Sequence, residues 1–222
     1  VEDIASGMDE YAVRQPLGVF AAITPFNFPA MIPLWFLPYA VATGNTFILK
    51  PSEKVPLSSQ LIFEAIDAVD FPDGVVNLVN GGAETVNTLL EHDDVAGVSF
   101  VGSSPVAKHV YETAAQHGKR VQAQGGAKNY AVVTESASLD DAVPNVIDSV
   151  YGNAGQRCLA NDVIVGVGGV SDELRERLVD AAEDLMVGAG YDEGTDVGPL
   201  ITADSRERVL GMIDDALDEG AE

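Results

Sequence analysis

The 222-residue chain has one cysteine, Cys158, which follows Arg157 in the segment YGNAGQRCLAND. A thiol reacts as its thiolate, and a neighbouring cation stabilises that form, so Arg157 could activate the thiol or hold an anionic substrate. Gly152 and Gly155 would let the backbone pass close to a ligand. Cys158 is therefore a candidate nucleophile, although a buried structural cysteine is the alternative. A protease-like Cys–His pair is not indicated, since every histidine lies in the first part of the chain: His92, His109 and His117.

The segment TPFNFP, residues 24–29, follows an apolar run that predicts a buried strand over residues 17–24. Asn27 would then lie at the carboxyl end of that strand, where open parallel sheets bind their ligands. Its amide could donate a hydrogen bond to an oxyanion that develops in a reaction. Phe28-Pro29 reads as the first turn of a helix, so a cap of that helix is the alternative role of Asn27.

Two further turns after predicted strands carry groups that suit a dinucleotide. In LKPSEKVP, Lys50 and Glu53 stand where Rossmann-like sheets hold a ribose, with the acid accepting from a hydroxyl. A solvated turn with a capping Ser52 would also explain that motif. In FVGSSPVAKHV, Gly102 and Ser103 precede a helix, whose N-terminus could contact phosphate. The G-x-G-x-x-G fingerprint is absent, so this motif alone does not establish a dinucleotide site.

The elements that must position these residues alternate along the chain. Apolar runs predict strands, and the segments between them predict helices. This alternation predicts a parallel sheet covered by helices, a Rossmann-like α/β fold. After four pairs of a strand and a helix, a fifth strand, a glycine turn and another strand are expected in residues 119–133. A helix over 139–153, a strand over 162–170 and acidic helices then begin a second α/β part. The first four strands are expected at 17–24, 45–51, 74–80 and 95–103, with helices at 27–43, 58–70, 84–92 and 105–117.

Charge and composition exclude several classes of partner. With 35 acidic and 12 basic residues, the net charge is −23, so the chain repels nucleic acid and anionic membranes, and neither is expected as a partner. The acids are dispersed over the predicted helices, which indicates a salt-adapted, halophilic surface; a specific cation site is the alternative. One cysteine excludes a disulfide framework and fits a reducing cytoplasm. The longest apolar stretch, residues 28–44, contains three prolines and predicts a buried helix.

Taken together and in this order, these segments resemble the aldehyde dehydrogenase superfamily over essentially the whole chain. The segments PLGVFAAITPFNFPAMIPLWFLPYAVATGNTFILKPSEKVP and GNAGQRCLA look closest to the methylmalonate-semialdehyde dehydrogenases. The resemblance implies that Cys158 attacks the aldehyde carbonyl, and that the Asn27 side chain and the Cys158 N–H hold the oxyanion. Hydride then passes to a nicotinamide, which leaves a thioester on Cys158.

The same resemblance implies NAD as the cofactor, bound along the carboxyl edge of the sheet. A carboxylate at Glu53 favours NAD over NADP, because it repels a 2′-phosphate. No metal site is expected. The residues that the resemblance assigns to the dinucleotide are Thr24, Phe26, Lys50, Glu53, Lys54, Ser103 and Gly125.

One departure from the superfamily pattern bears on how the thioester is resolved. Hydrolytic members carry Glu-Leu-Gly-Gly-Lys, and that Glu activates the attacking water. This chain has QGGAK at residues 124–128, and the Gln124 amide cannot act as a general base near neutral pH. The methylmalonate-semialdehyde group also lacks the Glu and uses coenzyme A as acceptor. That group commonly has Asn where this chain has Gln124. The resemblance thus implies coenzyme A as co-substrate.

Arg157 gains a sharper role from the resemblance, because this group recognises a substrate carboxylate with arginines, one of them beside the nucleophile. The second arginine and a second ribose-contacting Glu are expected outside the 222 residues. The implied reaction is the NAD-dependent, coenzyme A-acylating oxidation of malonate or methylmalonate semialdehyde. Its products would be acetyl-CoA or propionyl-CoA, NADH and carbon dioxide, a step of valine catabolism.

The expected domains follow the same pattern. Residues 1–13 would end a bridging, oligomerisation segment, residues 14–128 would form the NAD-binding domain, and residues 129–222 would begin a catalytic domain. The chain starts abruptly and is expected to stop inside a helix, as an internal fragment of a longer cytoplasmic protein that forms a homodimer or homotetramer. Two alternatives stay open: a hydrolytic NAD-dependent aldehyde dehydrogenase for another substrate, and an inactive nucleotide-binding fragment.

Overall fold

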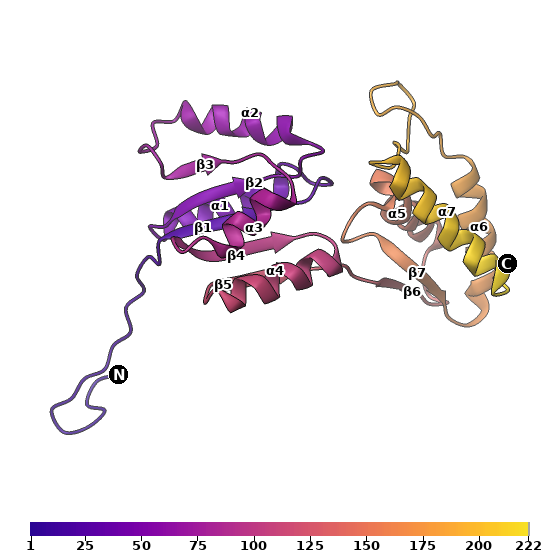
Figure 1. Cartoon of the computed structure of the whole chain (residues 1–222). Helices are drawn as coiled ribbons and strands as arrows, with labels where there is room; N and C mark the ends of the chain where they lie inside the picture. The colour runs from indigo at the N-terminus through magenta and orange to yellow at the C-terminus, as the bar shows by residue number, and fades with distance from the viewer. Residues whose placement is uncertain (222) are drawn as a thin grey trace. The chain divides into compact units, whose positions relative to one another are not determined.

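A computed structural model describes residues 1–221 (Figure 1). Its contacts divide the chain into two compact units, one from Val1 to Gly125 and one from Gly126 onward. The first unit is built on a five-stranded parallel sheet in the order β3-β2-β1-β4-β5. The predicted parallel α/β fold is confirmed. The strands are β1 (Val19–Ile23), β2 (Thr46–Lys50), β3 (Val76–Leu78), β4 (Val95–Val101) and β5 (Arg120–Gln124).

Helices cover both faces of this sheet because successive strand residues point to opposite faces. Ala21 and Ile23 pack in one apolar cluster with Leu90 and Val110, which come from α3 and α4. Ala22, between them, packs in a second cluster with residues of α1 and β2. β1 is therefore apolar on both faces, as its sequence predicts. The helices are α1 (Met31–Ala42), α2 (Pro56–Asp67), α3 (Ala83–Glu91) and α4 (Ser104–Gln116).

Helix α1 differs from its expected form in two ways. It begins at Met31 after Ala30 as N-cap, so the proline of its first turn is Pro33 rather than Pro29, and Asn27 does not cap it. Pro33 is tolerated there because the first N–H groups of a helix have no internal partner. The prediction of a buried helix is also wrong, since only Ile32, Pro33 and Leu37 of α1 are buried and Tyr39 is 75% exposed. The sheet covers only one face of α1, and that face carries the buried residues Ile32, Pro33 and Leu37.

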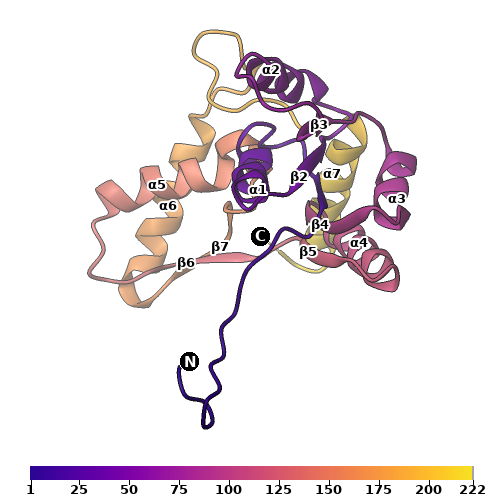
Figure 2. The same ribbon diagram turned by 90° about the vertical axis from the view of Figure 1, so that its left-hand side faces the viewer.

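The second unit has a two-stranded parallel sheet, β6 (Asn129–Val133) beside β7 (Asn161–Gly166). Helices α5 (Leu139–Tyr151) and α6 (Ser171–Glu183) lie next to each other in this unit (Figure 2). Their apolar residues form a core with those of the sheet, including Val133, Val143 and Leu174. Short 3₁₀ turns at Gly152–Gly155 and Gly168–Val170 follow α5 and β7.

Helix α7 (Ala203–Asp218) corrects a further expectation. Thr202 caps its start, since the Thr202 hydroxyl accepts from the Ser205 N–H at 3.1 Å. The helix was expected to continue to the last residue, but Gly220 has φ +95° and the Ala221 N–H bonds back to the Ala216 carbonyl. Glycine enters this left-handed conformation without steric cost, which ends the helix.

Residues 1–17 are exposed and form no helix or strand. No helix of residues 1–221 has the length and apolar character that a membrane crossing requires.

A buried lysine ties the end of α3 to β4. Lys119 is 8% exposed, and its ammonium donates to the carbonyls of His92 and, at 2.9 Å, of Val95. Carbonyls at a helix C-terminus suit a cation, because they form the negative end of the helix dipole. Lys119 therefore donates to the buried Val95 carbonyl, and it adds a second donor to the His92 carbonyl, which also accepts from the Val95 N–H at 3.1 Å.

Replacing Lys119 by methionine is expected to destabilise the first unit by about 1–3 kcal/mol, since the buried Val95 carbonyl loses its ammonium donor and the His92 carbonyl keeps the Val95 N–H alone. Amide hydrogen exchange of the full-length protein should report it as faster exchange in α3 and β4. The matched control is Lys108→Met on α4, because Lys108 is 75% exposed and pairs only with Glu112 among residues 1–221. Equal exchange in both variants would show that the two carbonyl bonds contribute nothing.

Candidate active site

The carboxyl ends of β1 and β2 bring together five of the residues assigned to the dinucleotide. Thr24, directly after β1, donates its N–H to the Lys50 carbonyl at 3.1 Å. The Thr24 side chain is 4% exposed, and its hydroxyl has no hydrogen-bond partner among residues 1–221. A buried hydroxyl without a partner is destabilising, so this edge fits a ligand that supplies a polar group, as the ribose and amide groups of NAD do.

Lys50 and Glu53 form an ion pair at this edge, with Lys50 Nζ 3.2 Å from Glu53 Oε2. The Lys50 side chain is 5% exposed, whereas that of Glu53 is 55% exposed and faces solvent. The pKa of Glu53 is lowered, chiefly by a hydrogen bond from its own backbone N–H; burial opposes this effect, and the nearby charges of Lys50 and Lys54 lower the pKa further. The carboxylate is therefore ionised at neutral pH, where it can accept from a ribose hydroxyl and repel a 2′-phosphate.

Lys54 and Phe26 join the two loops on either side of this pair. Lys54 Nζ lies 5.8 Å from the centroid of the Phe26 ring, a cation–π contact between the loop after β1 and the loop after β2. The structure thus places Thr24, Phe26, Lys50, Glu53 and Lys54 within one neighbourhood, at the edge where parallel sheets bind nucleotides.

Ser103 and Gly125 lie at the ends of the two next strands. Ser103 is the N-cap residue of α4, and its hydroxyl makes no capping hydrogen bond. The Gly102 N–H bonds to the Gln124 carbonyl at 3.1 Å, which holds the turns after β4 and β5 together. A side chain at position 125 would come within 3.2 Å of the Ser104 Cα, so glycine permits this close approach. The strand order reverses between β1 and β4, so the α4 N-terminus stands beside the switch point, where it can bind phosphate.

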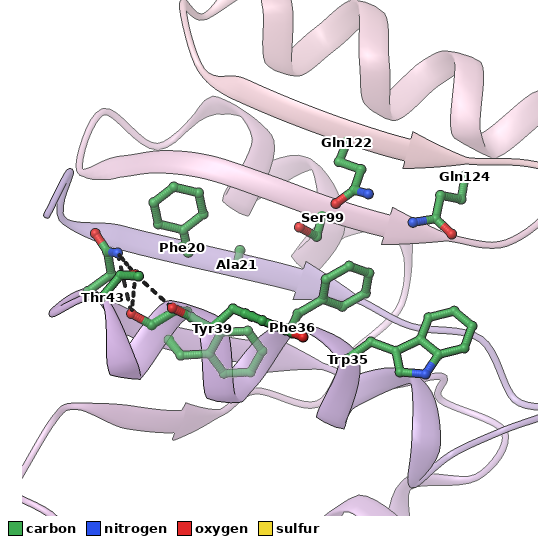
Figure 3. A pocket seen from close by; sticks show the side chains of 12 residues that line it. Phe20, Ala21, Trp35, Phe36, Tyr39, Thr43, Ser99, Gln122 and Gln124 are labelled. Atoms are coloured by element: carbon green, nitrogen blue, oxygen red, sulfur yellow. Dashed lines mark hydrogen bonds between the residues drawn. The ribbon is translucent and has the colours of Figure 1, made fainter. Parts of the chain in front are cut away.

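Gln124 lines a cavity of about 510 Å³ between α1 and the sheet (Figure 3). Polar side chains from β4 and β5 enter it, those of Ser99, Gln122 and Gln124, opposite the rings of Trp35 and Phe36 on α1. None of the residues that line this cavity is Asp, Glu, His, Lys or Arg. Gln124 therefore has no carboxylate or imidazole beside it in this cavity that could act as a general base in its place. The other lining residues are Phe20, Ala21, Tyr39, Ala40, Thr43, Asn45 and Phe47.

Cys158 is half-buried and follows a tightly wound loop in the second unit. Asn153, Ala154 and Gly155 all have positive φ, at +55°, +52° and +70°. This left-handed conformation costs a non-glycine residue about 1–2 kcal/mol, so surrounding contacts must maintain it. The Gln156 side chain supplies two of them. Its Nε2 donates to the Asn153 carbonyl at 3.1 Å, and its Oε1 accepts from the Ile201 N–H at 2.9 Å.

Arg157 is held against the C-terminal turn of α5. Its Nη1 donates to the Asp148 carbonyl at 3.2 Å and lies 3.9 Å from Asp148 Oδ2. A side chain at position 152 would come within 2.5 Å of this Nη1, so Gly152 leaves the space that the guanidinium fills. Asp148 was not predicted as part of the site, because nothing in its helix distinguishes it from the many other acids of the sequence. Asp148 contacts only Nη1, which leaves the Nε–Nη2 edge for a carboxylate.

Asn129 is a second residue of this site that was not predicted from the sequence. It is the first residue of β6, and its side chain donates to the carbonyls of Cys158 and Ala160. The position of Asn129 directly after the glycine turn QGGAK was the available signal. Among residues 1–221, no group of three or more His, Cys, Asp or Glu side chains could hold a metal ion.

The structure thus gathers the predicted cofactor residues at one edge of the first unit, and Cys158 with Arg157 in one loop of the second. Asn27 lies half-buried in the loop after β1. The pairing of Asn27 with Cys158, which joins residues of different units, stays a prediction.

Comparisons with known proteins relate the whole chain to one family. The sequence profile of the aldehyde dehydrogenase family matches residues 1–222. Malonate-semialdehyde dehydrogenase 2 of Geobacillus thermodenitrificans strain NG80-2 is 51% identical over 219 residues, which is 99% of this chain and 45% of that protein. The chain therefore spans about half the length of this relative.

Solved structures agree with the sequence comparison. A Sinorhizobium meliloti 1021 protein in complex with NAD, assigned as a methylmalonate-semialdehyde dehydrogenase, superposes with a TM-score of 0.95 at 44% identity, over 100% of this chain and 45% of that one. The methylmalonate-semialdehyde dehydrogenase of Oceanimonas doudoroffii superposes with a TM-score of 0.90 at 47% identity, over 94% and 43%. The sequence and the fold thus lead to the same group of proteins.

Proposed function

Because this chain belongs to the aldehyde dehydrogenase family, we propose that its protein oxidises malonate or methylmalonate semialdehyde with NAD and transfers the acyl group to coenzyme A. The names of the similar proteins support the substrate class. The single observation that carries the choice of acceptor is Gln124, an amide in a cavity whose lining includes no carboxylate. An enzyme that forms a thioester but lacks a base to activate water needs another nucleophile to release it.

In the proposed reaction the Cys158 thiolate adds to the aldehyde carbon and forms a carbon–sulfur bond. The Asn27 amide and the Cys158 N–H stabilise the resulting oxyanion. Bound NAD accepts the hydride that leaves this carbon. The thiolate of coenzyme A then attacks the thioester carbonyl, the bond to Cys158 breaks, and Cys158 leaves as a thiolate. Loss of the substrate carboxylate as carbon dioxide breaks a carbon–carbon bond, and the remaining carbon takes a proton; the family resemblance supports this step.

The same proposal assigns the other residues. Seven residues would bind NAD: Thr24, Phe26, Lys50, Glu53, Lys54, Ser103 and Gly125. Their place along one edge of the sheet supports this assignment, as does the Thr24 hydroxyl, which has no partner within residues 1–221. Arg157 would hold the substrate carboxylate through its Nε–Nη2 edge.

We also propose the wider organisation of the protein. Residues 14–128 would be the NAD-binding domain, residues 129–222 the first part of the catalytic domain, and residues 1–13 the end of a segment used in dimer or tetramer contacts. The scarcity of cysteine supports a cytoplasmic location. The net charge of −23 supports a surface adapted to high salt.

The test of this function is NADH formation by the full-length protein with malonate semialdehyde, in high salt, with and without coenzyme A. Without coenzyme A we expect a burst of about one NADH per active site, because the thioester accumulates. With coenzyme A we expect steady turnover. Steady turnover of equal rate in its absence would show that water resolves the thioester and would exclude an acylating enzyme.

A further inference from the structure

We propose that Asn129 is a positioning residue for the nucleophile, which fixes the backbone of the Cys158 loop from the C-terminal side. The inference rests on the proposed role of Cys158 but uses a residue to which the family resemblance assigns no role. It follows from the hydrogen bonds of Asn129: its side chain donates to two carbonyls of the Cys158 loop, and its backbone N–H donates to Asp162.

The side-chain amide of Asn129 donates both of its hydrogens to the loop. Its Nδ2 lies 2.8 Å from the Cys158 carbonyl oxygen and 2.8 Å from the Ala160 carbonyl oxygen. An amide NH₂ has two donors, and two acceptors at this distance satisfy both. The carbonyls on either side of Leu159 are therefore tied to one atom, which restricts the backbone dihedrals from Cys158 to Ala160.

The backbone of Asn129 is fixed independently. Its N–H donates to Asp162 Oδ2 at 2.8 Å, and Asp162 also pairs with Lys128 at 3.6 Å. Asn129 is the register partner of Asn161 where β6 meets β7. We call the two bonds from Asn129 to the Cys158 and Ala160 carbonyls the clamp. Because Asn129 belongs to a strand rather than to a loop, the clamp is built on the kind of element that positions a reactive group most accurately.

The N-terminal side of the loop has its own restraints. Gln156 ties it to Ile201, and Arg157 ties it to Asp148. On the C-terminal side Ala160 is 5% exposed, and its carbonyl is one of the two that Asn129 holds. A nucleophile displaced by about 1 Å can lose about 100-fold in rate, so these few bonds bear directly on attack. Without Asn129, fewer contacts would hold the strained backbone conformation of residues 153–155 in place.

The test compares Asn129→Ala and Asn129→Asp with the control Asn145→Ala in the full-length protein. Asn145 Nδ2 also donates to backbone, to the single carbonyl of Asp141 at 2.7 Å, but on the exposed surface of α5. The Asp variant keeps the shape of the side chain and replaces the donor by an acceptor, so it tests the hydrogen bonds even if the Ala variant folds poorly. Two quantities are measured: amide exchange of residues 156–160, and the rate constant of the NADH burst with malonate semialdehyde.

We expect exchange in residues 156–160 to rise about tenfold or more and the burst rate constant to fall about 10- to 100-fold in both Asn129 variants. The KM for NAD should stay within about twofold, because the cofactor residues belong to the other unit, and Asn145→Ala should match the unchanged protein. Unaltered exchange would overturn the clamp whatever the activity. Raised exchange with an unaltered burst would overturn the positioning role. Failure of the proposed function would appear separately, as a burst that survives Cys158→Ser or as steady turnover of the unchanged protein without coenzyme A.

Discussion

Cys158→Ser is expected to abolish both the NADH burst and steady turnover, with a loss of about 10⁴-fold or more, as loss of a catalytic nucleophile does elsewhere. A serine hydroxyl is far less acidic than a thiol, and residues 151–161 contain no Asp, Glu, His or Lys side chain that could activate it. The measurement is single-turnover NADH fluorescence on the full-length protein with malonate semialdehyde. The chain contains no second cysteine, so the substitution removes its only thiol.

The control for this variant is cofactor binding. Titration with NAD should give a Kd within about twofold of the unchanged protein, because Lys50, Glu53 and Thr24 lie in the other unit and keep their contacts. A Cys158→Ser protein that binds NAD and still gives a full burst would remove Cys158 from the chemistry. A protein that has lost both activities would point to misfolding, and alkylation of Cys158 with iodoacetamide in the native protein would then supply the same test.

Gln124→Glu is expected to give turnover without coenzyme A, with the deacylation rate rising about 10²- to 10⁴-fold, the usual contribution of a general base. The change restores a carboxylate at the position where hydrolytic members of the superfamily carry one, and Glu is nearly isosteric with Gln. In a cavity faced by Trp35 and Phe36 the pKa of the new carboxyl should lie above its ordinary value, because burial disfavours the charge. Hydrolysis should therefore increase with pH as the base ionises.

Gln122→Glu is the matched control for this gain of function. Gln122 precedes Gln124 by two residues on β5 and lines the same cavity, so its side chain leaves the same face of the strand about 6.6 Å away. A carboxylate at position 122 is the same kind of base as one at position 124, but it lies elsewhere in the cavity. We therefore expect turnover of this variant to stay dependent on coenzyme A. Equal hydrolysis by both variants would mean that any carboxylate in the cavity suffices. No hydrolysis by Gln124→Glu would mean that water is excluded by another feature.

The sequence predicted the fold well in segments where the hydrophobic pattern and the flanking glycines allow few alternative secondary structures. β1 and β2 read as continuous apolar runs, and the structure places them as parallel neighbours with the register Ile23–Lys50. The start of α1 was misplaced because Pro29 and Pro33 are equally good first-turn residues, and the choice between them depends on packing against the sheet. The end of α7 was missed although Gly220 is a usual C-terminal glycine, because helical periodicity continues through it.

The candidate site was predictable to a different degree in its two parts. The cofactor edge followed from topology, since carboxyl ends of parallel strands meet at one edge of the sheet. The contacts of the Cys158 loop could not be predicted, because Asn129, Asp148 and Ile201 lie 29, 10 and 43 residues from Cys158 in the sequence. Only folding brings such distant polar groups together, and their residue types are too common to mark them.

The bond between Arg157 and Asp148 has a thermodynamic consequence for ligand recognition. An arginine that is already held in one rotamer has lost its conformational freedom before a ligand arrives, which spares about 0.5–1.5 kcal/mol of ordering entropy on binding. Carboxylate binding at Arg157 should therefore show a less unfavourable entropy than binding to a free surface arginine. The planar guanidinium of Arg157 is oriented before a ligand arrives. A lysine at this position would keep the positive charge but not the fixed orientation of the donors, so the selectivity for acidic over neutral aldehydes would weaken.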